Sequence, residues 1–134
     1  MDKVRIFVDS NILVDYFSGR MNDGLAARIM QVGRSGRYEL VTSILSAANT
    51  VYLRKYFNES FSPAYIEKVV TILPLTLSEW NNALQVPVSD FEDCLQISCA
   101  INNGCIRIIT RDHDYRNCPL VTMTPREFLD QVEI

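Results

Sequence analysis

The chain has 134 residues, of which 48% are hydrophobic and 22% are charged, and its formal net charge is −3. Together with a mean hydropathy of +0.03, this composition is typical of a globular protein, and we expect a single domain over residues 1–134. The net charge gives no general attraction to nucleic acid, and no apolar run approaches the ~18 residues of a membrane-spanning helix.

Compartment and cysteine chemistry are predicted from the same composition. The N-terminal residues lead directly into a strand-like run, so we expect no signal peptide, and a cytoplasmic protein. Cys94, Cys99, Cys105 and Cys118 show no Cys-x-x-Cys spacing, and His113 is the single histidine. A zinc site is therefore disfavoured, and we expect free thiols in a reducing compartment.

The first secondary-structure elements meet at Asp9. Val4, Ile6, Phe7 and Val8 form a short apolar run without turn residues, which is typical of a buried parallel strand. Apolar residues at helical spacing begin at Ile12, and Ser10 or Asn11 is predicted to cap this helix. Asp9 then lies at the carboxyl end of a strand, where ligands bind in open α/β sheets. Two readings stay open here, a helix cap and a metal ligand or base.

The remainder of the chain alternates between strand and helix patterns. Pro74 places the strand near residues 71–74 at an edge of the sheet. Such alternation predicts a parallel sheet with helices on both faces. The further strands are predicted near residues 39–42, 106–110 and 120–122, and the further helices near residues 25–33, 44–56, 63–70, 78–84, 90–103 and 125–132.

Several acidic residues fall beside Asp9 in this predicted architecture. Asp90 and Asp93 share one face of a helix start, while Asp112 and Asp114 follow the strand near residues 106–110. Asp9, Asp93 and Asp112 are thereby expected to converge on one edge of the sheet. Carboxylates packed together repel by about 4 kcal/mol per pair at ~4 Å and a dielectric of ~20, and a hard cation such as Mg²⁺ or Mn²⁺ removes that repulsion. The alternative is that the acids are separate caps and loop residues.

Three stretches of the chain, taken in order, resemble the PIN domain family. They are Phe7-Val8-Asp9-Ser10-Asn11-Ile12, Asp90-Phe91-Glu92-Asp93-Cys94-Leu95-Gln96 and Ile108-Ile109-Thr110-Arg111-Asp112. The resemblance implies a three-layer α/β/α sandwich around a five-stranded parallel sheet. It also implies a metal-dependent nuclease acting on single-stranded RNA and, in small bacterial members, the toxin of a toxin–antitoxin pair.

The same resemblance assigns roles to individual residues. It implies that Asp9, Asp93 and Asp112 are catalytic metal ligands and that Asp114 is a fourth ligand. Thr110 matches a hydroxyl that steadies the first aspartate, Asn11 matches a residue that orders the same loop, and Asp90 is a further supporting residue. An antitoxin protein and a second copy of the chain are the protein partners that we expect.

One position departs from the family pattern. Asn49 stands where the family usually has a glutamate, about one turn into the helix that follows Ser43. A neutral amide leaves the site one charge short, and Asp90 or Glu92 is the candidate to replace that charge. A second function therefore stays open, a catalytically impaired module that binds RNA or a partner protein.

Other residues have more than one reading. Arg111, next to the acidic site, is a candidate for contacting the RNA backbone. A Ser-His-Asp site with Ser10 and His113 is disfavoured, because no oxyanion-hole glycine pattern accompanies it. Tyr52, Tyr56 and Phe57 are expected in the core or on a protein-binding surface, with stacking on RNA bases as the alternative.

Overall fold

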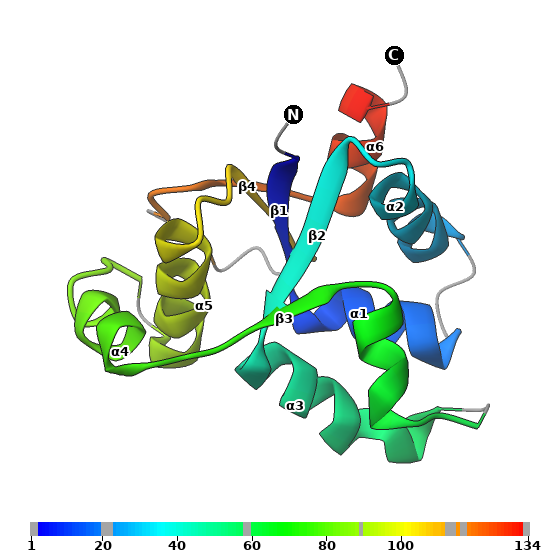
Figure 1. Ribbon diagram of the computed structural model, residues 1–134, viewed down its shortest axis with the longest axis horizontal. Helices are drawn as coiled ribbons and strands as arrows, with labels where there is room; N and C mark the ends of the chain where they lie inside the picture. Colours follow the sequence, from blue (N-terminus) through cyan, green and yellow to red (C-terminus); the bar gives the residue numbers. More distant parts are fainter. Residues whose placement is uncertain are drawn as a thin grey trace.

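The computed structural model describes residues 3–19, 23–57, 60–88, 90–111, 115 and 118–132, and its centre is a five-stranded sheet (Figure 1). The strands lie in the order β3-β2-β1-β4-β5, and all four pairings are parallel. The predicted five-stranded parallel sheet is thus confirmed, with β3 at an edge. The strands are β1 (Val4–Val8), β2 (Tyr38–Ser43), β3 (Thr71–Leu73), β4 (Arg107–Ile109) and β5 (Val121–Met123).

Helices flank this sheet on both sides. In Figure 1, α4 and α5 lie to the left of β1 and β2, whereas α2 and α6 lie to their right. The α-helices are α1 (Ser10–Ser18), α2 (Leu25–Arg34), α3 (Ile44–Tyr52), α4 (Leu77–Ala83), α5 (Phe91–Asn102) and α6 (Pro125–Val132). Two 3₁₀ helices, η1 (Leu53–Tyr56) and η2 (Pro63–Lys68), follow α3.

The central strand β1 serves two hydrophobic cores. Ile6 and Val8 belong to a cluster that contains residues of α1, α2 and α6, whereas Phe7 belongs to a second cluster with residues of α5. All three side chains are at most 1% exposed. Burying a side chain of this size contributes about 1.5–3 kcal/mol. Burial on both faces explains why the strand is apolar without alternation, and it confirms the three-layer architecture.

The carboxyl ends of the strands set the position of the candidate site. Helix α1 begins two residues after β1, and α3 begins directly after β2, so both helices start at the same edge of the sheet. Helix α5 ends shortly before the start of β4, at the opposite edge of the sheet. Its twelve residues therefore place its first turn near the carboxyl ends of the strands. The first turns of α1, α3 and α5 thus gather at the edge where ligands bind in open parallel sheets.

Several predicted helix boundaries differ from the structure. The helix expected over residues 44–56 is an α-helix only to Tyr52 and then tightens into η1, and the helix expected over residues 63–70 is the 3₁₀ helix η2. Helix α4 is capped by Thr76 rather than Ser78, because Thr76 and Glu79 form a reciprocal capping box. A 3₁₀ helix has 3.0 residues per turn and an α-helix has 3.6, so over four to six residues the spacing of apolar residues does not distinguish the two.

Other expectations can be compared with burial and hydropathy. Cys94, Cys99 and Cys105 are buried, Cys118 is half-buried, and all four are free thiols, as predicted. Within the described ranges, no helix has both the length and the apolar character that crossing a membrane requires.

Candidate active site

Asp9 connects β1 to α1. It is only 7% exposed, and its Oδ1 accepts a hydrogen bond of 2.7 Å from the backbone N–H of Ser10. Asp9 itself is the N-cap of α1, so the expectation that Ser10 or Asn11 caps this helix was wrong. Asp, Ser and Asn all cap helices well, and in the structure the first of the three, Asp9, occupies the N-cap position. A cap and a site residue are therefore compatible readings of Asp9.

Three side chains hold the other carboxylate oxygen of Asp9. Its Oδ2 accepts hydrogen bonds from Thr110 Oγ1 at 2.8 Å, from Tyr115 Oη at 3.2 Å and from Asn11 Nδ2 at 3.4 Å. Strand pairing brings these groups together, since the backbone N–H of Asp9 also bonds to the carbonyl of Ile109 at 3.0 Å. Several donors on one buried carboxylate fix its orientation.

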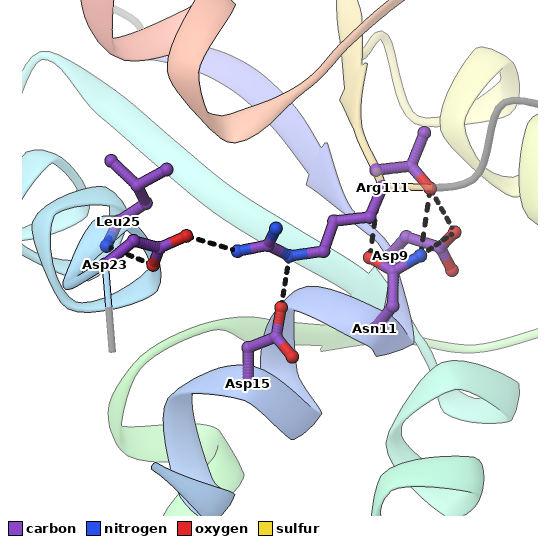
Figure 2. Close-up of polar contacts among 7 residues, drawn as sticks. Asp9, Asn11, Asp15, Asp23, Leu25 and Arg111 are labelled. Atoms are coloured by element: carbon purple, nitrogen blue, oxygen red, sulfur yellow. Dashed lines mark hydrogen bonds and ion pairs between the residues drawn. The ribbon is translucent and has the colours of Figure 1, made fainter. Parts of the chain in front are cut away.

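The side-chain amide of Asn11 joins α1 to the segment after β4 (Figure 2). Its Nδ2 donates to Thr110 Oγ1 at 3.1 Å, and its Oδ1 accepts from the backbone N–H of Arg111 at 3.2 Å. Thr110 is 3% exposed, so these bonds form in a water-poor setting. The structure thus brings together Asp9, Asn11 and Thr110, the three residues that the family resemblance groups at this loop. Tyr115 was missed, because nothing in the sequence around it indicated that its hydroxyl would be buried.

Arg111 lies between two carboxylates (Figure 2). Its Nε donates to Asp15 Oδ2, and its Nη2 lies 3.2 Å from Asp23 Oδ2. Burial lowers the pKa of Arg111, but its bonds to Asp23 and Asp15 outweigh this and leave the pKa raised. The pKa of Asp23 is lowered by the backbone N–H of Leu25 and by Arg111. Much of the charge of Arg111 is therefore compensated locally, which the sequence did not indicate.

The start of α5 carries three acidic residues. Asp90 is the N-cap and accepts from the backbone N–H of Asp93 at 3.2 Å, as the cap reading of Asp90 predicted. Glu92 and Asp93 lie in the first turn, where the helix dipole favours negative charge. Asp93 is half-buried, and Glu92 is exposed. The dipole partly offsets the repulsion among these carboxylates.

Helix α3 contacts one of these three acids, Glu92. Asn49 Nδ2 donates a hydrogen bond of 2.6 Å to Glu92 Oε1. One turn deeper, the buried pair Ser43 and Gln96 joins the end of β2 to α5 through a hydrogen bond between their side chains. Asn49 therefore lies next to an acid of the neighbouring helix, and the contact with Glu92 could not be assigned from sequence.

The segment after β4 also approaches Asp93. Burial raises the pKa of Cys118, and the negative charge of Asp93 raises it further. Tyr115, from the same segment, bonds to Asp9. Asp9 thus interacts with Tyr115 and Asp93 with Cys118, two described residues between β4 and β5. Burial also raises the pKa of Cys94, with Asp93 and Asp90 adding to the effect, so neither thiol is a nucleophile at neutral pH.

The donor chemistry of these residues suits a hard divalent cation. Carboxylate oxygens are available on Asp9, Glu92 and Asp93, and Asn49 adds an amide oxygen; such ligands suit Mg²⁺ and Mn²⁺. Across the described ranges, however, no three His, Cys, Asp or Glu side chains lie close enough to share one ion. The predicted ligands Asp112 and Asp114, like His113, lie outside the described residues. Their convergence with Asp9 and Asp93 stays a prediction.

Comparisons with known proteins place these features in context. A family model described as PIN domain matches residues 5–114. Ribonuclease VapC1 of Aquifex aeolicus (strain VF5) is 25% identical over 140 residues, which cover 98% of this chain and 97% of that protein.

Similar solved structures share the architecture. VapBC2 from Rickettsia felis, bound to a DNA fragment from its promoter, has a TM-score of 0.71 at 11% identity and covers 90% of this chain and 98% of its own. VapC20 of Mycobacterium tuberculosis, described as a toxin that cleaves the Sarcin-Ricin loop, has a TM-score of 0.68 at 18% identity over 90% of this chain and 99% of its own. A toxin-antitoxin complex from Klebsiella pneumoniae has the same TM-score, 0.68, and the same identity, 18%, over 90% of this chain and 97% of its own. At these identities the likeness establishes the fold.

Proposed function

Because the chain belongs to the PIN domain family, we propose that it is a divalent-metal-dependent endoribonuclease that cleaves single-stranded RNA. The observation that carries this proposal is the buried Asp9, held by Thr110 and Tyr115 at the edge where α5 presents Asp93. Similarity to a ribonuclease along almost the entire chain supports the same activity.

The proposed metal ligands are Asp9, Asp93 and Asp112, with Asp114 as a fourth. Mg²⁺ or Mn²⁺ bound there supplies an activated water and neutralises charge on the phosphate. Thr110, Asn11 and Tyr115 fix the Asp9 carboxylate through hydrogen bonds, so that it does not have to reorganise when substrate binds. Asp90 supports Asp93 by capping the helix that carries it.

The chemical step is hydrolysis of a phosphodiester. The water oxygen forms a bond to phosphorus, the bond from phosphorus to the leaving ribose oxygen breaks, and that oxygen takes a proton from solvent. The proton lost by the water passes to a carboxylate at the edge of the site, and Glu92 is the proposed acceptor. Glu92 is exposed and oriented by Asn49, which suits a group that exchanges protons with solvent.

A second function is favoured by one position. If Asn49 leaves the metal site too weak to work, the chain is a catalytically impaired PIN domain that binds RNA or a protein without cutting. Cleavage of a single-stranded RNA with and without Mn²⁺, beside the Asp93→Asn variant, separates the two functions. Metal-dependent cleavage that Asp93→Asn abolishes supports the nuclease, whereas RNA binding without cleavage supports the impaired module.

Protein partners belong to the same proposal. We propose an antitoxin that covers a groove of about 410 Å³ between α3 and η2, whose lining is mostly apolar. We further propose a homodimer through the exposed face of α4, where Leu77 is 75%, Trp80 is 49% and Leu84 is 61% exposed. Light scattering of the parent and of Trp80→Ser tests the dimer. The groove is lined by Ile44, Ala47, Ala48, Val51, Pro63, Ala64, Ile66, Glu67 and Ile72.

Arg111 is proposed to contact the RNA backbone with the part of its charge that Asp15 and Asp23 leave uncompensated. A cytoplasmic location, where RNA is available, completes the proposal.

A further inference from the structure

Two tyrosines and a lysine form an exposed group at the end of α3 and in η1. Tyr52 is 73% exposed and Tyr56 is 64% exposed. The ammonium of Lys55 lies between them, 5.2 Å from the ring centroid of Tyr52 and 5.3 Å from that of Tyr56. We name Tyr52, Lys55 and Tyr56 the aromatic platform. Their exposure rules out the core for both tyrosines and leaves the other two expectations, a protein-binding surface and stacking on RNA bases.

Three phenylalanines near the platform have a structural role, because they pack against one another. Phe17, Phe57 and Phe61 are partly buried and meet edge to face, with centroid distances of 5.0 Å and 5.1 Å. That ladder contributes to the packing beneath η1. The two platform tyrosines contribute little to it, because most of their surface faces solvent.

The platform extends from the candidate active site along one side of a helix. Tyr52 follows Asn49 by three residues, a spacing that keeps side chains on one face of α3. Tyr56 lies in η1, and Lys55 contacts both its ring and that of Tyr52. With rises of 1.5 Å and 2.0 Å per residue in the two helix types, Tyr56 lies about 12 Å beyond Asn49 along the axis. Asn49 itself bonds to Glu92, beside Asp93.

The positive charge and the exposed rings of this surface indicate which kind of partner it binds. The candidate site is acidic and the chain carries a net charge of −3, so a phosphate backbone needs a local cation to approach. Lys55 and the exposed Arg54 supply positive charge, and the tyrosine rings supply flat apolar faces. Flat rings interleaved with cations are the recurring arrangement for single-stranded nucleic acid, where bases stack and cations contact phosphates.

We propose that the aromatic platform binds the single-stranded RNA on one side of the bond to be cut, with bases stacked on Tyr52 and Tyr56 and phosphate held by Lys55. The inference rests on the proposed ribonuclease activity, and it adds a defined contact surface for the substrate outside the acidic site.

The test is binding of a short fluorescein-labelled oligouridine in EDTA, followed by fluorescence anisotropy, so that cleavage plays no part. Tyr52→Ala and Tyr56→Ala should each weaken binding about 5- to 100-fold, and Tyr52→Phe should retain it, because a phenyl ring still stacks. Lys55→Ala should reduce the slope of log affinity against log salt by about 0.7.

Matched controls come from η2, where Lys68 lies 5.2 Å from the ring of Tyr65 in the same kind of pair. Tyr65→Ala and Lys68→Ala should leave oligouridine affinity unchanged. Photocrosslinking of 4-thiouridine RNA to the parent protein gives a measurement that needs no substitution, and the crosslinked peptide should contain Tyr52 or Tyr56.

The outcomes separate this inference from the proposed function. Loss of binding in the platform variants without any Mn²⁺-dependent cleavage by the parent supports the platform and contradicts the nuclease. Cleavage with unchanged binding in Tyr52→Ala and Tyr56→Ala overturns the platform alone. A change in oligomeric mass in those variants, with unchanged RNA affinity, also overturns it and makes this face a protein-binding surface.

Discussion

Asn49 on α3 donates its side-chain amide hydrogen to Glu92 on α5 over 2.6 Å, so a neutral residue and an acid meet at the position where the family resemblance predicts a glutamate. The two helices thus bring a carboxylate beside Asp93 although α3 itself contributes none at this point. This contact makes the charge of the site open to a direct test.

Replacing Asn49 by Glu should place a second carboxylate against Glu92. Repulsion between the two should lower the melting temperature in EDTA, and Mn²⁺ should recover more than the lost stability, because a ligand that binds only the folded state stabilises it. We expect calorimetric Mn²⁺ affinity to rise about 10-fold. Asn49→Gln is the matched control, because a glutamine has the size of the introduced glutamate but no charge. Equal Mn²⁺ affinity in the Glu and Gln variants would show that Asn49 lies outside the metal site.

Thr110 should be important for the folded state because of its bond to Asp9. Thr110→Val keeps the shape and removes the hydroxyl that donates to Asp9 Oδ2 at 2.8 Å. The loss of a donor to a buried carboxylate should lower the free energy of unfolding by about 1–3 kcal/mol, measured by urea denaturation. Thr110→Ser retains the hydroxyl and should recover most of that energy. A Val variant as stable as the parent would remove Thr110 from the support of Asp9.

Sequence reasoning identified the parts of this site that belong to a regular local pattern or to a motif of the family. Residues 4–8 were recognised as a buried strand from the apolar Val4, Ile6, Phe7 and Val8, whereas the grouping of Asn11 and Thr110 with Asp9 came from the family resemblance. Asp15 was not recognised, because on a helix it has the pattern of a solvated residue. Its partner Arg111 comes from 96 positions later in the chain, and only the folded structure brings the two together.

The ion pair of Asp15 with Arg111 provides a prediction about buried charge. Asp15 is 4% exposed, so Arg111→Met should remove an ion pair from a buried carboxylate and lower the free energy of unfolding by about 3–5 kcal/mol. The double variant Arg111→Met with Asp15→Asn should recover much of this loss, because it removes the buried negative charge as well. Thermal unfolding of the single and double variants measures the coupling. If the double variant lost as much stability as the sum of the two single substitutions, Asp15 and Arg111 would not be energetically coupled.

The buried thiols make stability depend on alkaline pH. Burial raises the pKa of Cys99 to about 12 and that of Cys105 to about 11, from 9.0. Their folded pKa values are raised, so the stability they contribute is complete below pH 9.0 and falls as the unfolded thiols ionise. Two retained protons should give a loss of up to about 2.7 kcal/mol per pH unit.

A single substitution isolates this effect. Cys99→Ala should reduce the alkaline slope of the free energy of unfolding by up to about 1.4 kcal/mol per pH unit, and adding Cys105→Ala should reduce it by a similar amount. Urea denaturation at a series of pH values above 9.0 measures both slopes. An alkaline slope that is identical in the parent and the double variant would attribute the loss to other groups.

The proposed nuclease is tested most directly by the initial rate of single-stranded RNA cleavage as a function of Mn²⁺ concentration. We expect no cleavage in EDTA and a rate that rises and saturates with Mn²⁺. We also expect a loss of at least about 100-fold in Asp9→Asn and Asp93→Asn, and the parent rate in Asp130→Asn, which changes an exposed acid of α6. Cleavage in EDTA, or parent rates in the Asp9 and Asp93 variants, would contradict a metal-dependent active site at this edge of the sheet.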